Sequence, residues 1–175
     1  MKLSEHFGVD EFRCHCGTCG EPIVDLELVE NLERWRAILN QDLAPGQEEH
    51  ILLITSGCRC ADWNGHEGGK PGSSHLYDPQ AGKAGKAADC WSPTRSVGEI
   101  YTAALQVEGF KGIGLAPPVA TKDAPDGKGR PGYVHVDVRP TATRAQWGYN
   151  DNGVVVAIAD VLPRVGIGPE PGMVV

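Results

Sequence analysis

The sequence has no long hydrophobic run. Its longest uninterrupted apolar stretch, Val154–Ala159, is far shorter than the roughly 20 residues that a transmembrane helix needs. The first residues, Met1–His6, contain no apolar segment of the kind found in signal peptides. The sequence therefore predicts neither a membrane span nor export by the usual secretory route.

Basic residues are also scarce. Lys and Arg number 16 against 23 Asp and Glu, which gives a formal net charge of −7. A general nucleic-acid binder or a polybasic membrane-surface protein needs a basic face, so the acidic balance argues against both classes. The length of 175 residues and the hydrophobic content of 41% are typical of one globular domain. We expect a monomer that binds neither nucleic acid nor membrane.

Glycine and proline are plentiful, at 23 and 13 residues, and predict many turns and few long helices. Apolar residues at helical spacing predict a helix from Leu26 to Leu39, capped by Asp25. The Ser96–Glu99 capping box predicts a second helix that ends near Val107. Further predicted elements are strands over 51–55, 111–115 and 133–138, a short helix near Ala61, and a strand or helix over 154–165.

The six cysteines favour metal binding over disulfides, because no secretion signal precedes them. Cys14, Cys16 and Cys19 have tight ligand spacing, and Cys60, or alternatively Cys58, could complete a structural zinc site. Such a site would pin the N-terminal segment to the loop that carries Arg59. His15 as a substitute ligand, a disulfide, and free thiols remain alternatives, and Cys90 is expected to be a buried thiol.

Histidines and carboxylates form a second set of candidate ligands. Catalytic zinc sites usually have three protein ligands and one open position. His135 and Asp137 lie two residues apart on a predicted strand, so their side chains share one face. The segments to be considered together are 73–75 (Ser-Ser-His), 85–89 (Gly-Lys-Ala-Ala-Asp) and 133–137 (Tyr-Val-His-Val-Asp), with 4–7 (Ser-Glu-His-Phe), 11–12 (Glu-Phe) and 55–60 (Thr-Ser-Gly-Cys-Arg-Cys) before them.

In this order the segments resemble the zinc D-Ala-D-Ala carboxypeptidase family, which belongs to the lysostaphin/D-Ala-D-Ala peptidase/hedgehog group, in its phage and bacterial wall-lytic branch. The resemblance covers about Ser4 to Arg139. It implies an α+β fold in which a small antiparallel sheet, flanked by helices, carries the zinc site. It also implies zinc-dependent hydrolysis of a peptide bond in peptidoglycan, with the stem peptide as partner. The implied zinc ligands are His75, Asp89 and His135, and Arg59 would hold the substrate or the oxyanion.

Two departures from the family pattern leave alternatives open. The stretch Tyr77–Ala84 lengthens the gap between His75 and the following carboxylate, so Asp78 is a rival to Asp89. We favour Asp89 and expect the extra residues to form a surface loop. Gly132 and Tyr133 occupy the places where some relatives carry a general base. Asp137 could act as that base, or it could orient His135.

Other functions remain alternatives to the peptidase. A zinc-stabilised but inactive wall-binding or phage structural module would keep the same ligands, and an amidase would cut the sugar–peptide link. A catalytic pair of Cys58 and His66 has no supporting spacing. We expect a peptidase domain over residues 1–150 and a C-terminal extension over 151–175. The protein would be cytoplasmic until its release to the wall, or phage-associated.

Overall fold

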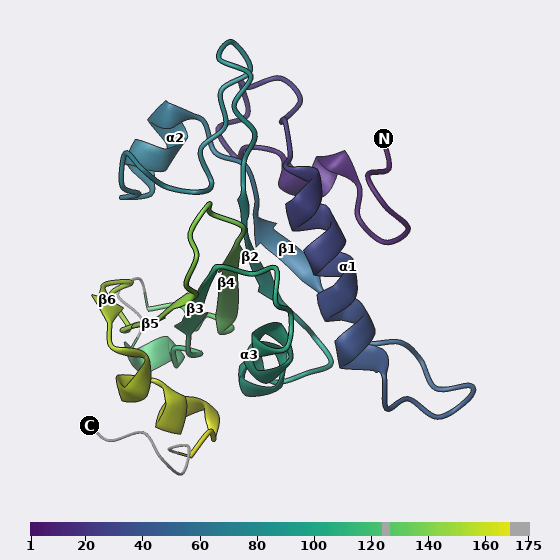
Figure 1. The fold of residues 1–175 in the computed structure, drawn as a ribbon. Coiled ribbons are helices and arrows are strands. Elements are labelled where there is room, and N and C mark those ends of the chain that lie inside the picture. Colours follow the sequence, from purple (N-terminus) through teal and green to yellow (C-terminus); the bar gives the residue numbers. More distant parts are fainter. Residues whose placement is uncertain (124–126, 169–175) are drawn as a thin grey trace.

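A six-stranded sheet with helices packed on it forms the centre of the computed structural model, which describes residues 1–123 and 127–168 (Figure 1). The α-helices are α1 (Leu26–Asn40), α2 (Ala61–His66) and α3 (Val97–Leu105). The strands are β1 (Leu53–Ser56), β2 (Ala87–Trp91), β3 (Gly112–Ala116), β4 (Tyr133–Asp137), β5 (Ala145–Tyr149) and β6 (Val155–Val156). Short 3-10 helices are η1 (Val9–Phe12), η2 (Thr121–Asp123), η3 (Ile158–Asp160) and η4 (Leu162–Val165).

The sheet is mixed, with the strand order β1-β2-β4-β3-β5-β6. The predicted α+β class is confirmed, but the prediction of an antiparallel sheet is wrong in one place. After β4 the chain passes to the far side of β3, where β5 pairs with β3 in parallel. The other strand pairs are antiparallel. The sequence pattern of a strand does not predict this crossover, because the crossover depends on which strand β5 pairs with in the folded sheet.

The two faces of the sheet have different side chains, as alternation along a strand requires. On β4, Val134 and Val136 are fully buried and belong to the same apolar cluster as residues of α1 and α3. Trp35 of α1 donates a hydrogen bond of 2.9 Å from Nε1 to the carbonyl oxygen of Ile100 in α3, which ties these two helices together. Tyr133, His135 and Asp137 project from the opposite face of β4. The core therefore lies on one face, and the other face is left for polar chemistry.

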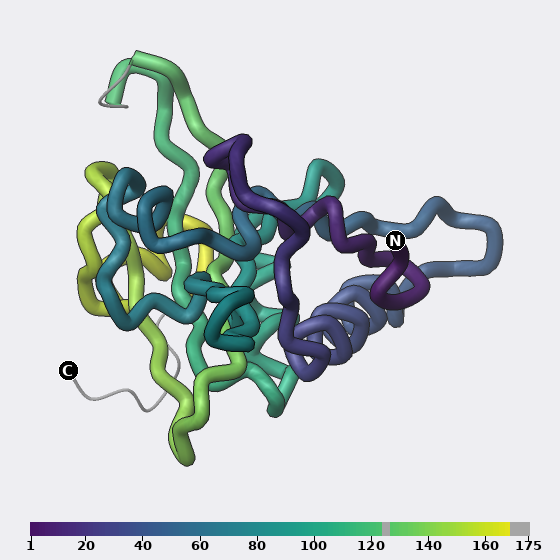
Figure 2. The backbone as a smooth tube through the Cα atoms, turned by 90° about the horizontal axis from the view of Figure 1, so that it is seen from above, coloured from purple at the N-terminus to yellow at the C-terminus, as the bar shows by residue number. Residues whose placement is uncertain are grey.

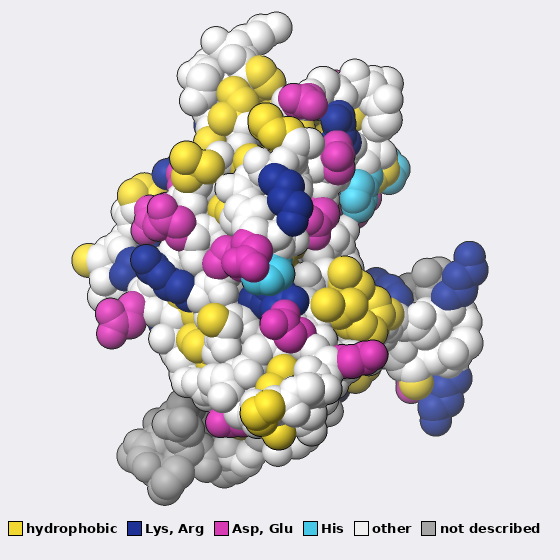
Figure 3. Space-filling view, turned by 90° about the vertical axis from the view of Figure 1, so that its right-hand side faces the viewer, with side chains coloured by type: hydrophobic (Ala, Val, Ile, Leu, Met, Phe, Trp, Pro, Cys, Tyr) yellow, Lys and Arg dark blue, Asp and Glu magenta, His cyan; other side chains and the backbone are white. Residues whose placement is uncertain are grey.

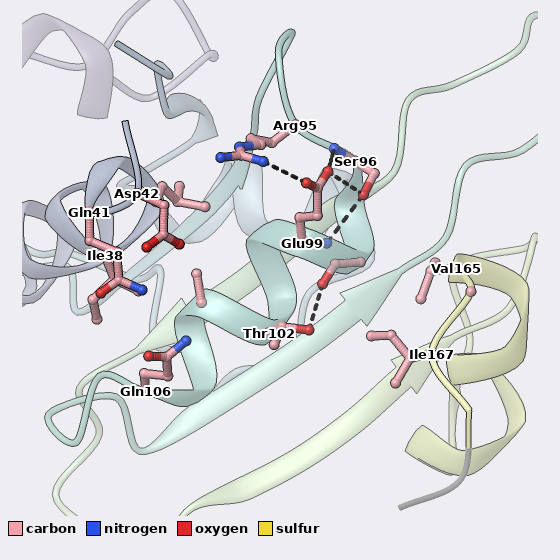
Figure 4. Close-up of a pocket in the computed structure, with 14 residues that line it drawn as sticks. Ile38, Gln41, Asp42, Arg95, Ser96, Glu99, Thr102, Gln106, Val165 and Ile167 are labelled. Atoms are coloured by element: carbon pink, nitrogen blue, oxygen red, sulfur yellow. Dashed lines mark hydrogen bonds and ion pairs between the residues drawn. The ribbon is translucent and has the colours of Figure 1, made fainter. Parts of the chain in front are cut away.

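Both long helices begin where their sequences predict. The carboxylate of Asp25 accepts a hydrogen bond of 2.9 Å from the backbone N–H of Glu27 at the start of α1. Ser96 and Glu99 form the predicted capping box of α3, which Figure 4 shows. Each cap satisfies backbone N–H groups that have no partner within the helix. These local signals were sufficient to predict where the helices begin, because capping involves residues close in the sequence.

Part of the predicted C-terminal extension packs on the domain. The strand β6 pairs with β5, and Val161 and Leu162 are buried. The segment 154–165, for which the sequence left strand and helix open, is thus a short strand followed by two 3-10 turns. Residues 169–175 lie outside the described part of the chain.

Charged side chains of both signs lie on the surface. Figure 3 shows acidic and basic side chains interspersed on the face that includes α1. The N-terminal segment and α1 lie on one side of the molecule and the C-terminal elements on the other (Figure 2). Within residues 1–123 and 127–168, no helix has both the length and the apolar character needed to cross a membrane.

Candidate metal centre

The structure brings His75, Asp89 and His135 together, as the family resemblance predicts. Asp89 on β2 and His135 on β4 are direct partners in the sheet register. His75 comes from the loop after α2, and its backbone oxygen accepts a hydrogen bond of 2.8 Å from the N–H of Arg59. All three side chains are buried, with exposed fractions of 4%, 8% and 6%. The sheet and one anchored loop thus fix three polar side chains at one point.

Three electron-pair donors converge at this point. Nε2 of His75 lies 3.1 Å from Nδ1 of His135, and Oδ1 of Asp89 lies 3.3 Å and 2.8 Å from these two nitrogens. Tetrahedral zinc with bonds of about 2.0–2.2 Å holds its ligand atoms about 3.3 Å apart. The spacing of the three atoms is therefore close to that of a zinc site.

The neighbours of the two imidazoles determine which nitrogens are free. Nδ1 of His75 lies 2.7 Å from the carbonyl oxygen of Gly57, which can only accept a hydrogen bond. We therefore assign the ring proton of His75 to Nδ1, which leaves a lone pair on Nε2. Both nitrogens of His135 contact a carboxylate, Nδ1 that of Asp89 and Nε2 that of Asp137. In the tautomer with the proton on Nε2, which donates to Asp137, Nδ1 also has a free lone pair. Two lone pairs and a carboxylate oxygen at contact distance repel one another unless a proton or a metal ion lies between them. The donor set of two imidazoles and one carboxylate fits a metal ion such as zinc.

The electrostatics of the site also favour a cation. Burial alone would raise the pKa of Asp89, but the charges and hydrogen bonds of His75 and His135 hold it well below its usual range. Burial alone would lower the pKa of His135, yet hydrogen bonds with Asp137 and Asp89 raise it to about 9. Both shifts arise from the close contact between imidazole and carboxylate groups at this point.

Asp137 lies behind His135 as seen from the ligand atoms. Its Oδ2 contacts Nε2 of His135 at 3.2 Å, whereas Nδ1 is the atom that faces Asp89. The carboxylate is fully buried and also receives hydrogen bonds from the side chain and backbone of Arg139. Burial would raise the pKa of Asp137, but the hydrogen bonds from His135 and Arg139 keep it well below its usual range. Of the two predicted roles, this placement favours orienting His135.

Arg59 reaches the site from the other direction. Its Nη2 donates a hydrogen bond of 2.9 Å to Oδ2 of Asp89, the oxygen that does not face the histidines, and its Nε donates to Oγ of Ser56 at 2.9 Å. These contacts use two of the five N–H donors of the guanidinium. Arg59 is thus held beside the candidate ligand Asp89, where a guanidinium can bind a carbonyl or carboxylate oxygen.

The sequence analysis missed the aromatic residues of the site. The Trp147 ring on β5 lies 5.3 Å from the ring of His135, and Arg139 stacks on Trp147 at 5.2 Å. Tyr133 and Tyr149 lie next to each other on the same face, with ring centroids 5.9 Å apart. The alternation of Trp147 and Tyr149 was the available signal, but β5 was not predicted.

Two glycines on β3 make room for these side chains. A Cβ atom on Gly112 would lie 2.3 Å from Oδ2 of Asp137, and one on Gly114 would lie 2.6 Å from Nε1 of Trp147. Real Cβ atoms do not approach other atoms so closely. The Gly-x-Gly pattern of β3 thus leaves its site face bare, so that residues of β4 and β5 can lie over it.

Asp78, the rival ligand, lies outside the metal centre. Asp78 and Lys83 form a small bridge with two backbone hydrogen bonds, and residues 78–83 are exposed at a loop that precedes β2 (Figure 1). The Asp78 carboxylate accepts hydrogen bonds from the backbone of this turn instead. The inserted residues therefore form a surface loop, although Tyr77 at their start is buried.

The structure also brings together Cys14, Cys16, Cys19 and Cys60, whose sulfur atoms all lie within 4.8 Å of one another. The thiol of Cys58 instead lies 3.6 Å from the carbonyl oxygen of Ile23, and Cys90 is fully buried. All six cysteines are free, and His15 is exposed.

A separate pocket of about 440 Å³ lies between α1, α3 and the C-terminal segment (Figure 4). Ile38, Arg95, Thr102 and Ile167 are among the residues that line it, and none of the predicted site residues does so. The candidate metal centre and this pocket are therefore distinct.

Comparison with protein families gives one match. The family described as Peptidase M15 matches residues 5–117, which is well over half of the chain. The matched region contains His75 and Asp89 but ends before His135, so the sheet register is what brings His135 to the other two residues. No curated protein and no solved structure matches the chain.

Proposed function

The chain belongs to the peptidase M15 family, and from this membership and the site geometry we propose that it is a zinc-dependent peptidase that hydrolyses a peptide bond in the stem peptide of bacterial peptidoglycan. M15 peptidases are zinc-dependent, and the family indicates a peptidoglycan-type substrate. The enzyme would be a carboxypeptidase or an endopeptidase. Its role would be lysis of the cell wall, including lysis by a phage.

The observation that carries this proposal is the convergence of three ligand atoms. His75, Asp89 and His135 present two imidazole nitrogens and one carboxylate oxygen within 3.3 Å of one another. When bound at such a site, zinc supplies a Lewis acid that polarises a carbonyl and lowers the pKa of its water. Three protein ligands leave a fourth position for water or substrate, as hydrolysis requires.

The other residues act on the substrate or on the ligands. Arg59 is positioned to bind the carbonyl oxygen of the peptide or a terminal carboxylate, because its side chain lies at the ligand Asp89. Asp137 holds the ring proton of His135 on Nε2 and so keeps Nδ1 free for the metal. Trp147 and Tyr149 form a half-buried aromatic wall beside the site, suited to contact the short apolar side chains of a stem peptide.

Digestion of purified peptidoglycan tests the proposal. Sacculi are incubated with the zinc-loaded protein, and the released fragments are analysed by mass spectrometry. We expect fragments with a newly formed carboxyl terminus within the stem peptide, and none from His135→Ala. Fragments in which the whole stem peptide is separated from the sugar would instead identify an amidase.

The same assay distinguishes a second candidate, an inactive zinc-stabilised wall-binding module. One observation favours it: Asp89 and Asp137, the carboxylates seen to contact the histidines, already have partners. A binding module would retain zinc and bind sacculi but release no fragments.

A further inference from the structure

The four clustered sulfurs lie outside the metal centre that carries the proposed function. Cys14, Cys16 and Cys19 follow η1, and Cys60 caps the N-terminus of α2. Sγ of Cys14 lies 3.7 Å from Sγ of Cys60, and no two of the four sulfurs are more than 4.8 Å apart. A tetrahedral zinc ion with Zn–S bonds of about 2.3 Å separates its sulfurs by about 3.8 Å. We propose that these four cysteines bind a second, structural zinc ion that fixes the N-terminal segment against the loop of Arg59.

Hydrogen bonds to the sulfurs support a thiolate site. Sγ of Cys16 accepts from the backbone N–H groups of Thr18 and Cys19, at 3.5 Å and 3.3 Å. Sγ of Cys14 accepts from the N–H of Cys60 at 3.4 Å, and Sγ of Cys60 accepts from the N–H of Trp63 at 3.4 Å. These N–H groups point at the sulfurs, so they stabilise negative charge there. Such bonds orient and stabilise metal-bound thiolates.

The segment from Arg13 to Gly20 has little else to hold it in place. Cys14 is buried, Cys16 and Cys19 are half-buried, and the other residues of the segment are exposed. Apart from the cysteines, its side-chain contacts include exposed ion pairs of Arg13 with Asp10 and Glu21. Gly17 has a φ of +72°, which permits the tight turn between Cys16 and Cys19. All four thiols are free in the structure, and one zinc ion would use all four. Zinc also converts its binding energy into folding energy for such a segment.

The cluster is coupled to the catalytic face through residues 58–60. The N–H of Cys58 donates to the carbonyl oxygen of Phe12 at 2.9 Å, and the N–H of Arg59 donates to that of His75 at 2.8 Å. The side chain of Arg59 contacts the ligand Asp89. The Arg59 backbone therefore lies between the N-terminal segment and the loop that carries His75. Cys60, the next residue, belongs to the sulfur cluster. A zinc ion at the cluster would act as the anchor of Arg59.

Metal counting with matched variants tests this proposal. The full chain is purified with zinc under reducing conditions, and zinc per chain is measured by elemental analysis. We expect two zinc ions in the wild type, one in His135→Ala and one in Cys16→Ser/Cys19→Ser. Cys58→Ala is the matched control, since this buried thiol lies next in the chain to Arg59 but outside the cluster, and it should keep both ions.

A spectroscopic measurement keeps the test independent of how the variants fold. Cobalt replaces zinc in the wild type and in His135→Ala, and the sulfur-to-cobalt charge-transfer absorption is recorded. We expect this band in both proteins, with unchanged intensity per chain. Wild-type protein that holds a single ion lost in His135→Ala, or that binds cobalt without the band, would overturn the second site but leave the peptidase proposal intact. Iron in the cluster, or a disulfide detected by mass spectrometry, would overturn it as well.

Discussion

Replacing Asp137 by asparagine separates the two roles that this carboxylate could have. The substitution preserves size but removes the negative charge and one acceptor oxygen. In the structure Asp137 accepts from Nε2 of His135 at 3.2 Å and from Arg139 through both of its oxygens. An amide has a single acceptor oxygen, so the side chain of the Asp137→Asn variant cannot serve both partners equally. We expect His135 to lose its fixed ring orientation.

The magnitude follows from the position of Asp137 behind His135, a proposed metal ligand. Loss of a hydrogen-bonded partner behind a ligating histidine typically weakens metal binding by about 10- to 100-fold. This corresponds to about 1.4–2.7 kcal/mol of binding free energy, since each tenfold change is about 1.4 kcal/mol. Arg139 is partly exposed, with 35% of its side chain accessible, so water can solvate it when the charge of Asp137 is lost. The main cost should therefore appear in zinc affinity.

The assay is a competition titration of zinc against a chelator, followed by peptidoglycan cleavage at saturating zinc. For Asp137→Asn we expect weakened binding and a kcat close to that of the wild type once the site is filled. Asp78→Asn, which alters an exposed carboxylate outside the site, is the matched control and should bind zinc normally. Unchanged zinc affinity together with a kcat lowered about 10²- to 10⁴-fold would refute the orienting role, because that loss is typical of a missing general base.

Three further predictions concern the same site. Arg59→Lys keeps the charge but loses the planar pair of contacts to Asp89 and Ser56. The kcat/KM for peptidoglycan cleavage should therefore fall at least about tenfold while the zinc content stays unchanged. Equal activity would show that Arg59 does not touch the substrate. Asp89→Asn should lose the zinc of the histidine site whereas Asp78→Asn should keep it, as measured by zinc per chain, and the reverse result would identify Asp78 as the ligand. Gly114→Ala places a Cβ 2.6 Å from Nε1 of Trp147, so the tryptophan must move. We expect a change in tryptophan fluorescence and reduced cleavage of peptidoglycan. The absence of both changes would argue against an aromatic wall.

Local signals predicted the helices and the best strand. The caps of α1 and α3 involve neighbouring residues, and the alternation of β4 follows from one face being buried. The strand β2 was missed because four of its five residues are buried, so that its sequence does not alternate. The strand β5 was missed because it contains no β-branched residue, and its parallel pairing with β3 is a long-range choice.

Some residues of the candidate site could be predicted from the sequence, and others could not. His75, Asp89 and His135 come from three distant segments, and only the resemblance placed them together before the structure did. The role of Asp137 was open in the sequence, since a strand pattern gives the face of a side chain but not which imidazole nitrogen it contacts. The aromatic wall depends on the bare face of Gly112 and Gly114, whose meaning appears once β3 is known to lie between β4 and β5.

The central claim is that the ion held by His75, Asp89 and His135 makes this protein a peptidoglycan peptidase, and a zinc titration of the metal-free protein tests it most directly. Bound zinc and the release of new stem-peptide carboxyl termini are measured on the same samples, for the wild type and for His135→Ala. We predict that cleavage by the wild type rises in proportion to the filling of the site that His135→Ala lacks, and that the variant cleaves at no zinc concentration. Cleavage by metal-free protein or by zinc-saturated His135→Ala, or a filled wild-type site without cleavage, would contradict the account.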